Sequence, residues 1–150
     1  MVCQDIMNRN VTIIKGDTSC REIIKLLRED PARPLVVANE AGFLLGVVTA
    51  RDFLQLHLER IQGDPLSAPA PQADEEALKS TMQRIANLVA KDLMVNAPIV
   101  AQVDTAVTSV IVPMAQKSLN YVPVVREGKI EGVISRAEIL RLMMELMPAS

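Results

Sequence analysis

The chain has 150 residues, of which 49% are hydrophobic and 23% charged, with a formal net charge of −2 at pH 7. This length fits one domain of ordinary size or two small units that share a core, and the charge argues against a nucleic-acid-binding surface. Aromatic residues make up only 2% of the sequence, too few for a platform that stacks single-stranded bases. We therefore expect any bound base to lie against aliphatic side chains.

The two cysteines, Cys3 and Cys20, are typical of reduced thiols in a cytoplasmic protein. No apolar run approaches the ~18 residues of a membrane-spanning helix. The first ten residues include Asp5 and lack the basic-then-apolar order of a signal peptide. We therefore expect a soluble protein of the cytoplasm that does not bind membranes.

An internal repeat runs through the chain. The triplet D-I-M at residues 5–7 recurs as D-L-M at 92–94, and the pair D-T at 17–18 recurs at the same shift as D-T at 104–105. From Gly42 onward the shift is one residue shorter, because the first copy has one extra residue in a turn. A constant shift with one turn deletion indicates a duplicated unit. The predicted boundaries are 1–61 for the first repeat, 62–88 for a linker with a helix, and 89–150 for the second repeat.

The first copy is predicted to form strand, helix, strand, strand and helix. A β-branched run at 11–14 predicts the first strand. The first helix starts at a capping box formed by Ser19 and Glu22 and ends before the pair Asp30-Pro31. A hairpin follows, with strands at 34–38 and 43–48, and the last helix starts near Thr49.

The second copy repeats this order, with strands predicted at 99–103, 121–125 and 129–134. Pro113 falls inside its first helix, where we expect a kink or a shortened helix because proline lacks a backbone donor.

The segment between the copies has two parts. Residues 63–73 contain three prolines among alanine and serine, which indicates a flexible or semi-extended linker. Residues 74–89 begin with three acids and carry an apolar stripe of Leu78, Met82, Ile85 and Val89, which predicts an amphipathic helix. The stripe could pack on its own domain or dock a partner, and we favour the first interpretation because amphipathic helices usually serve their own core.

The end of each hairpin carries the residues most suited to binding. The sequence G-V-V-T-A-R-D at 46–52 recurs as G-V-I-S-R-A-E at 132–138. A hydroxyl at a helix start, here Thr49, adds to the unpaired backbone N–H groups that attract phosphate. The carboxylate of Asp52 could accept hydrogen bonds from ribose hydroxyls, and Arg51 could add charge on a phosphate.

The same spacing has a structural interpretation. A Ser or Thr followed three residues later by an acid is also how a helix caps itself. Taken alone, capping is the commoner role of this pattern, and it fits Ser135 and Glu138 best because they match the Ser-x-x-Glu box. Duplication after matching strands favours the binding role without deciding between the two.

These segments together resemble the CBS domain, named for cystathionine β-synthase. The resemblance covers both copies and rests on D-I-M, D-T, the apolar hairpin and G-V-V-T-A-R-D, each found twice in closely related form. It implies an α/β (α+β) fold, in which two β-α-β-β-α repeats pack sheet to sheet with pseudo-two-fold symmetry. Such a tandem pair is called a Bateman module. It also implies two clefts that bind adenine nucleotides or related adenosyl ligands and so regulate an attached or partner protein.

The family's hydroxyl-x-x-Asp motif falls on Thr49 and Asp52, which the resemblance assigns to phosphate and ribose, and again on Ser135 and Glu138. Its base-lining positions fall on the first strands and on the apolar-Pro-Val strands. With Arg51 and Arg136 added, the candidate ligand-binding set is Thr12, Ile13, Leu35, Val36, Thr49, Arg51, Asp52, Pro98, Ile99, Val122, Pro123, Ser135, Arg136 and Glu138. In the leading arrangement Thr12, Ile13 and Leu35 hold the base beside Asp52.

Two departures from the family pattern matter. Glu138 is one methylene longer than the usual Asp, so the second cleft is expected to hold ribose poorly or to be empty. Pro34 lies two residues before the usual proline, so the wall of the first base pocket is expected to differ. The cleft at Thr49 and Asp52 is therefore the better candidate.

The predicted function is a regulatory module that binds AMP, ADP, ATP or S-adenosylmethionine and changes the activity of a partner protein. The alternative is a structural module that dimerises through its apolar, Met-rich last helix; a homodimer is expected in either case. A small enzyme has least support, because no base, nucleophile and orienting group occur together. His57 is the only histidine, so no histidine-rich metal site is expected.

Overall fold

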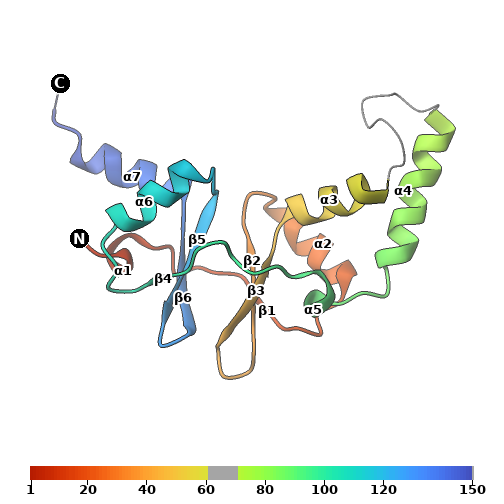
Figure 1. Ribbon diagram of the computed structural model, residues 1–150, viewed down its shortest axis with the longest axis horizontal. Helices are drawn as coiled ribbons and strands as arrows, with labels where there is room; N and C mark the ends of the chain where they lie inside the picture. Colours follow the sequence, from red (N-terminus) through yellow and green to blue (C-terminus); the bar gives the residue numbers. More distant parts are fainter. Residues whose placement is uncertain (61–70, 150) are drawn as a thin grey trace.

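The computed structural model describes residues 1–60 and 71–149, with side chains at 1–57 and 73–149. Each repeat contains one short helix, three strands and two longer helices. A further helix follows the first repeat in the chain and stands at its outer end, beside the last helix of that repeat and away from the second repeat (Figure 1). In chain order the elements are α1 (Cys3–Ile6), β1 (Ile13–Ile14), α2 (Cys20–Glu29), β2 (Leu35–Ala38), β3 (Leu44–Val48), α3 (Ala50–Arg60), α4 (Pro71–Ile85), α5 (Ala90–Leu93), β4 (Ala101–Gln102), α6 (Thr108–Gln116), β5 (Tyr121–Arg126), β6 (Lys129–Ser135) and α7 (Arg136–Leu146).

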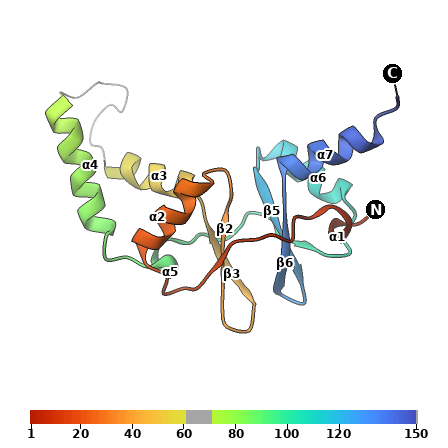
Figure 2. The same cartoon turned by 180° about the vertical axis from the view of Figure 1, so that it is seen from behind.

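The strands form two three-stranded sheets with the orders β1-β2-β3 and β4-β5-β6. In each sheet the first strand is parallel to the central one, which forms an antiparallel hairpin with the third. The two sheets stand next to each other, with α2 and α3 outside one and α6 and α7 outside the other (Figures 1 and 2). The predicted mixed α+β fold with two facing repeats is therefore confirmed.

Local sequence accounts for the ends of these elements. The Ser19 hydroxyl accepts a hydrogen bond from the Glu22 amide at 3.2 Å, as the predicted helix start requires. The hairpin turns place Gly42 at φ +91° and Gly128 at φ +83°, a region that glycine enters without strain. Pro113 lies inside α6 but does not end it, since the helix continues to Gln116.

The repeated polar pairs also have local roles. Asp5 Oδ2 accepts a hydrogen bond from the Val2 amide at 2.8 Å, and Asp92 Oδ2 accepts one from the Val89 amide at 3.0 Å. Each aspartate thereby closes one of the short helices, α1 and α5, which the sequence analysis did not predict. A single turn of helix is too short to leave a periodic signal.

The short helices cross over between the repeats. Cys3 and Met7 pack in the hydrophobic core of the second repeat, while Ala90 and Leu93 pack in the core of the first. Matching backbone bonds fix both crossings: Cys3 N donates to Thr105 O, and Ala90 N donates to Thr18 O, both at 2.8 Å. Each core is thus completed by the first residues of the other repeat.

The crossing segments pair with the third strand of the opposite sheet. Asn8 and Val133 exchange backbone hydrogen bonds of 2.9 and 3.0 Å, and Val95 and Val47 do the same. The segments pass so close that a Cβ on Gly132 would lie 2.9 Å from Asn8 O, and one on Gly46 would lie 3.0 Å from Val95 O. The glycine that opens each repeated motif is therefore required by the approach of another backbone.

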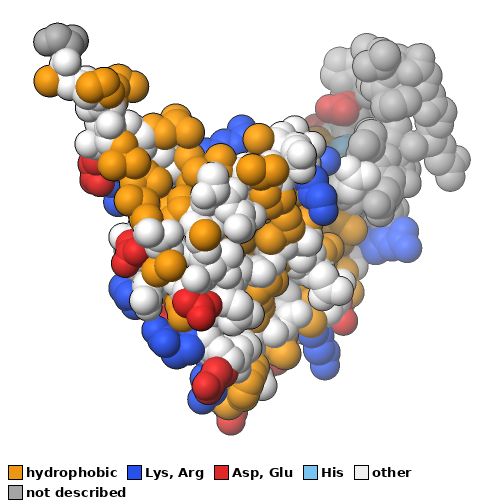
Figure 3. All heavy atoms as spheres, turned by 60° about the vertical axis from the view of Figure 1, so that its left-hand side comes forward, with side chains coloured by type: hydrophobic (Ala, Val, Ile, Leu, Met, Phe, Trp, Pro, Cys, Tyr) orange, Lys and Arg blue, Asp and Glu red, His pale blue; other side chains and the backbone are white. Residues whose placement is uncertain are grey.

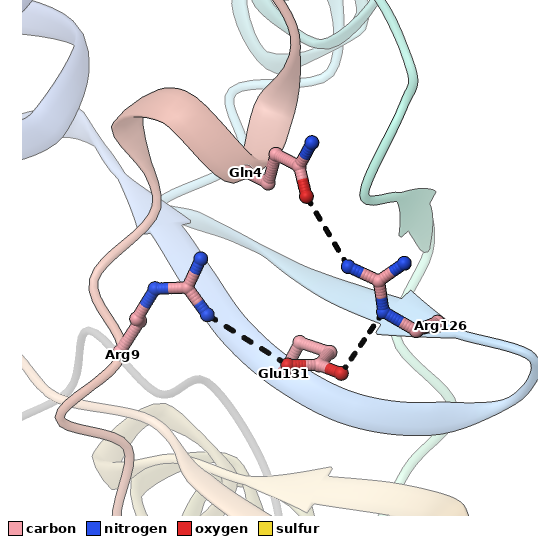
Figure 4. Close-up of polar contacts among 4 residues, drawn as sticks. All are labelled: Gln4, Arg9, Arg126 and Glu131. Carbon is pink, nitrogen blue, oxygen red and sulfur yellow. Dashed lines mark hydrogen bonds and ion pairs between the residues drawn. The ribbon is translucent and has the colours of Figure 1, made fainter.

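A surface network holds the first crossing in place (Figure 4). Glu131 lies between two arginines, 3.2 Å from Arg126 Nε and 3.8 Å from Arg9 Nη1, and Arg126 also donates to Gln4 Oε1 at 3.2 Å. The network joins α1 and the segment after it to the β5–β6 hairpin. Such exposed pairs contribute about 0–1 kcal/mol each, so the backbone pairing and the core contacts carry most of the attachment.

Helix α4 differs from its prediction at both ends. It begins at Pro71, inside the segment predicted as a linker, and most of that segment lies outside the described residues. Of the predicted apolar stripe, Ile85 is buried in the first core, whereas Leu78 and Met82 stay exposed. The buried Thr81 instead faces α3, where its hydroxyl lies 2.9 Å from His57 Nδ1. Packing on its own domain thus holds for the end of the stripe only.

Candidate functional site

The first hydroxyl and carboxylate pair lies where β3 ends and α3 begins. Asp52 Oδ2 accepts hydrogen bonds from the Thr49 amide at 2.7 Å and from the Thr49 hydroxyl at 3.3 Å. The capping role expected from the spacing is therefore present. Within residues 1–60 and 71–149, no hydrogen bond engages the other oxygen, Oδ1. Half of this carboxylate thus stays available to a ligand.

The second pair lies at the start of α7 and is arranged differently. Glu138 Oε1 accepts from the Ser135 amide at 3.3 Å, and Oε2 accepts from the Ser135 hydroxyl at 2.9 Å. Glu138 is only 5% exposed. Both of its oxygens are engaged by Ser135, so this carboxylate acts as a helix cap.

A large cavity adjoins the first pair; we name it the first cavity. Its volume is about 770 Å³, and the starts of α3 and α7, the segment before β4 and the α6–β5 loop enclose it. Its lining residues are Pro31, Ala32, Thr49, Ala50, Arg51, Asp52, Gln55, Val95, Asn96, Pro98, Lys117, Ser118, Leu119, Asn120, Tyr121, Ser135, Arg136 and Ala137.

A smaller cavity adjoins the second pair; we name it the second cavity. Its volume is about 270 Å³, and the segment before β1, the α2–β2 loop and the start of α7 enclose it. Its lining residues are Asn8, Asn10, Val11, Asp30, Ala32, Arg33, Pro34, Val133, Ser135, Ala137, Glu138 and Arg141.

The two cavities are related by the repeat. Each combines the hydroxyl and carboxylate pair of one repeat with the entry segment and the helix–strand loop of the other. This follows from the crossing, because Val95 pairs with Val47 beside the first cavity and Asn8 pairs with Val133 beside the second. A ligand in either cavity would touch both repeats.

Their charges differ. Among the described residues, the first cavity is lined by three cations, Arg51, Lys117 and Arg136, against the single carboxylate of Asp52. In the second cavity Arg33 and Arg141 face Asp30 and Glu138, so the charges balance. Arg33 is also held within its own repeat, 3.3 Å from Asp30 Oδ2 and 3.3 Å from the Thr12 hydroxyl. Only the first cavity carries an excess of positive charge.

The cavities contain some of the predicted binding residues. The first includes Thr49, Arg51, Asp52, Pro98 and Arg136, the second includes Glu138, and Ser135 lines both. Their contact with a ligand stays a prediction.

The strand residues predicted to hold the base, among them Thr12, Ile13 and Leu35, lie outside both cavity linings, so their contact with a ligand also stays a prediction. Leu35, Val36, Val122 and Pro123 are fully buried, because β2 and β5 are the central strands of their sheets. Ile13 is 52% exposed, and Ile99 packs against the second core. In the described part of the chain, neither cavity lining includes these residues or Thr12. The prediction placed Asp52 beside strands of its own repeat, whereas the first cavity places it beside Val95 and Pro98 of the other repeat.

The sequence analysis missed Tyr121, Lys117, Asn96 and Asn120, all of which line the first cavity. Tyr121 starts β5 and is partly buried, and burial, followed by the negative charge of Asp52, raises its pKa to about 12. Tyr121 therefore lies close enough to Asp52 to feel its charge, although the two belong to different repeats. The signal in the sequence was its repeat position, where the first copy has Pro34.

Comparison with known proteins identifies the family. The family model described as the CBS domain matches residues 3–59 and 90–145. The chain is a tandem pair of CBS domains. This agrees with the crossed pair of repeats and with the motif at the start of α3.

Two relatives match nearly all of this CBS pair. The uncharacterized protein MJ1426 of Methanocaldococcus jannaschii is 23% identical over 95% of this chain and 91% of that protein. The chloroplastic CBS domain-containing protein CBSX2 of Arabidopsis thaliana is 25% identical over 92% of this chain, which spans 60% of the length of CBSX2.

Solved structures share the fold. The crystal structure of CBSX2 in complex with AMP has a TM-score of 0.73 at 24% identity, covering 97% of both chains. The CBS pair of protein MJ0100, crystallised with 5′-methylthioadenosine and S-adenosyl-L-methionine, has a TM-score of 0.67 at 20% identity and covers 98% of both.

Membrane-spanning helices and metal sites are two further features to consider in the described residues. None of the helices in 1–60 and 71–149 combines the length and the apolar character needed to cross a bilayer. The same residues form no cluster of His, Cys, Asp and Glu suited to holding a metal ion.

Proposed function

We propose that this CBS pair is a regulatory module that binds one adenine nucleotide or related adenosyl compound in the first cavity. The observation that carries the proposal is the meeting, in one cavity of about 770 Å³, of a carboxylate oxygen without a partner among the described residues and three cations. Small-molecule sites typically measure about 300–1,000 Å³. Complexes of CBSX2 with AMP and of MJ0100 with adenosyl compounds support the class of ligand.

In the proposed complex, Asp52 Oδ1 accepts a hydrogen bond from a ribose hydroxyl. The Thr49 hydroxyl and the amides at the start of α3 face the phosphate, and Arg51, Lys117 and Arg136 supply positive charge around it. This charge favours AMP, ADP and ATP over S-adenosylmethionine, whose sulfonium is itself positive. We therefore expect a phosphorylated nucleotide to bind more tightly.

Regulation follows from the construction of the cavity. Its walls come from both repeats, so a ligand would stabilise the arrangement of repeats that it fits best. A ligand shifts a conformational equilibrium only by its difference in affinity between the states. The proposed role is to pass such a shift to a partner protein whose activity it changes. We propose no catalytic residue.

Isothermal titration with AMP, ADP, ATP and S-adenosylmethionine tests the binding proposal. We expect binding at one site per chain and a rise in melting temperature, because a ligand of the native state must stabilise it. A folded protein that gives no heat and no thermal shift with any of the four compounds contradicts the proposal. That outcome would favour the alternative, a structural module without a nucleotide.

A homodimer is a second proposal, supported by the surface of α7. Its exposed apolar side chains are Leu140, Met143, Met144 and Leu146, and Met147 follows directly after the helix. Figure 3 shows hydrophobic side chains gathered at that end of the molecule. In an antiparallel pair of α7 helices centred on Met143, Arg141 of one copy would face Glu145 of the other. Exposed apolar patches of this kind mark interaction sites.

The dimer has its own test. Light scattering should give twice the chain mass for the wild type, and Met144→Lys, at a side chain that is 73% exposed, should give a folded monomer. A wild type that stays monomeric at high concentration contradicts the dimer without touching the binding proposal.

A cytoplasmic location is also proposed, supported by the free thiols of Cys3 and Cys20.

A further inference from the structure

The single tyrosine of the chain lies in the wall of the first cavity. Among the described residues that line the two cavities, Tyr121 is the only aromatic one. Its repeat counterpart in the second cavity is Pro34. An aromatic face is therefore present in the cavity with excess positive charge and is replaced by an aliphatic ring in the other.

The position of Tyr121 is fixed by its strand. Tyr121 is the first residue of β5, the central strand of its sheet, and is paired there with Ser135 of β6. The residue is partly buried and lines the first cavity, so it is available on that side to a ligand. Because the strand holds its backbone, the ring meets a ligand with little ordering of the chain.

The surroundings of the ring divide the first cavity into two kinds of surface. Val95, Pro98 and Leu119 supply aliphatic groups, whereas the three cations and Asp52 supply charge. A nucleotide has the same division, since its base is a flat aromatic group and its sugar phosphate is polar. Stacking of a base on an aromatic side chain contributes substantially to the binding free energy, and any base can take part because every base has a π-face.

We propose that Tyr121 stacks against the base of the bound nucleotide and makes the first cavity selective for ligands that carry a base. The inference rests on the proposed nucleotide binding and adds the contact that recognises the base. Asp52 of one repeat then holds the ribose, while Tyr121 of the other holds the base. A sugar phosphate without a base would keep the first contact and lose the second.

The test compares AMP with ribose 5-phosphate in matched variants. Tyr121→Phe keeps the ring and should bind AMP within about threefold of the wild type. Tyr121→Leu and Tyr121→Ala lose the ring and should bind AMP about tenfold to a hundredfold more weakly, the range expected for one stacked base. Neither change should alter the affinity for ribose 5-phosphate, measured by competition where its heat is small. Pro34→Ala, at the repeat counterpart, is the control and should leave AMP binding unchanged.

The protein also carries its own probe. It has one tyrosine and no tryptophan, so tyrosine emission reports on Tyr121 alone. AMP should change this emission with the midpoint seen by calorimetry, and ribose 5-phosphate should change it far less. This readout needs no substitution, so it holds even if Tyr121→Ala does not fold.

The outcomes separate the two proposals. A wild type that binds no adenosyl compound overturns the proposed function. A wild type that binds AMP with unchanged tyrosine emission overturns the stacking contact alone. The stacking contact is also overturned if Tyr121→Leu binds AMP as tightly as the wild type, because the ring would then not matter. It is overturned too if Tyr121→Phe binds AMP as weakly as Tyr121→Leu, because the hydroxyl and not the ring would then matter.

Discussion

The first and second cavities are each bordered by one copy of the same repeated motif, but the acidic side chain of the motif is one methylene longer in the second copy. Asp52 reaches Thr49 with one oxygen and leaves the other free, whereas the longer Glu138 reaches Ser135 with both of its oxygens and is buried. The shorter side chain can cap a helix and still receive a ligand; the longer one serves the cap completely. The acid that completes its capping box with both oxygens is thus the one with no oxygen left for another partner.

Size and charge reinforce the contrast. The first cavity is about 770 Å³ and the second about 270 Å³, and the latter lies below the usual range for small-molecule sites. The two repeats thus supply similar frames, and differences at a few positions leave the first cavity larger and richer in positive charge among its described residues.

Removing the two carboxylates should affect AMP binding very differently, and this is the largest effect that we expect. Asp52→Ala should weaken AMP binding about tenfold to a hundredfold, because a hydrogen bond to a charged group contributes about 1.5–3 kcal/mol. Glu138→Ala should leave AMP binding within about twofold but lower the unfolding free energy by about 1–3 kcal/mol, since it strips a buried cap. Titration calorimetry and urea unfolding of both variants measure this. Equal losses of binding in the two variants would end the distinction between the cavities.

Adding a methyl group to either motif glycine should disturb the crossing that builds the cavity walls. Gly46→Ala places a Cβ 3.0 Å from Val95 O, and Gly132→Ala places one 2.9 Å from Asn8 O. Each should cost about 1–3 kcal/mol of stability by urea unfolding, in line with overpacked cores. Only Gly46→Ala should also weaken AMP binding, because Val95 lines the first cavity and Asn8 lines the second. Unchanged stability in both would contradict the close approach.

Shortening the second carboxylate should make the second cavity resemble the first in its capacity to bind a nucleotide. Glu138→Asp can no longer reach Ser135 with both oxygens, so one oxygen becomes available. We expect a second, weaker AMP site in addition to the first, visible as a late heat in titrations at high ligand concentration. Glu138→Gln, which keeps the length, is the matched control and should show the first site only.

The smallest effect concerns the ionisation of Tyr121. Burial is the larger cause of its raised pKa of about 12, and the Asp52 charge is the second. Asp52→Asn should therefore lower this pKa part of the way toward its ordinary value, because the phenolate no longer meets a negative charge. Glu138→Gln should leave it unchanged. Phenolate absorbance measures the titration directly, and it is preferable to stability because burial also raises the pKa of Cys3 and Cys20.

The sign of the stability effect follows from the same shift. The folded pKa of Tyr121 lies above the ordinary value of about 10, so the folded state holds the phenol proton more tightly than the unfolded chain. The contribution to stability is complete below pH ~10 and is lost as the pH rises towards ~12.

The sequence predicted features that depend on neighbouring residues. Turn residues and hydrophobic spacing act locally, so the sequence alone predicted the repeat, the hairpins, the cap at Ser19 and the motif at Thr49 and Asp52. The crossing could not be predicted, because identical periodicity in two copies does not say which copy receives Cys3 or Ala90. One clue was present: Gly46 and Gly132 interrupt apolar strands, and a glycine there indicates another backbone close by.

Thr49 and Asp52, predicted at the polar edge of the site, line the first cavity, whereas the central-strand residues predicted for its walls do not. Thr49 and Asp52 carry their geometry with them, since a carboxylate three residues after a helix start must turn back toward it. Leu35 and Val122 were assigned to walls because apolar strands can line a base pocket, but a central strand places such residues in the core. Tyr121 is distinguished only by the cavity that it shares with Asp52 of the other repeat, which no local sequence pattern reveals.

The exchange of α1 and α5 between the repeats has a consequence for dissecting the molecule. Separate fragments of residues 1–88 and 89–150 would each retain a sheet but lose the plug that fills its core, Ala90 and Leu93 in one case and Cys3 and Met7 in the other. Neither fragment should be stable alone, and mixing them should restore both through complementation. The two repeats are thus expected to fold and unfold as one cooperative unit.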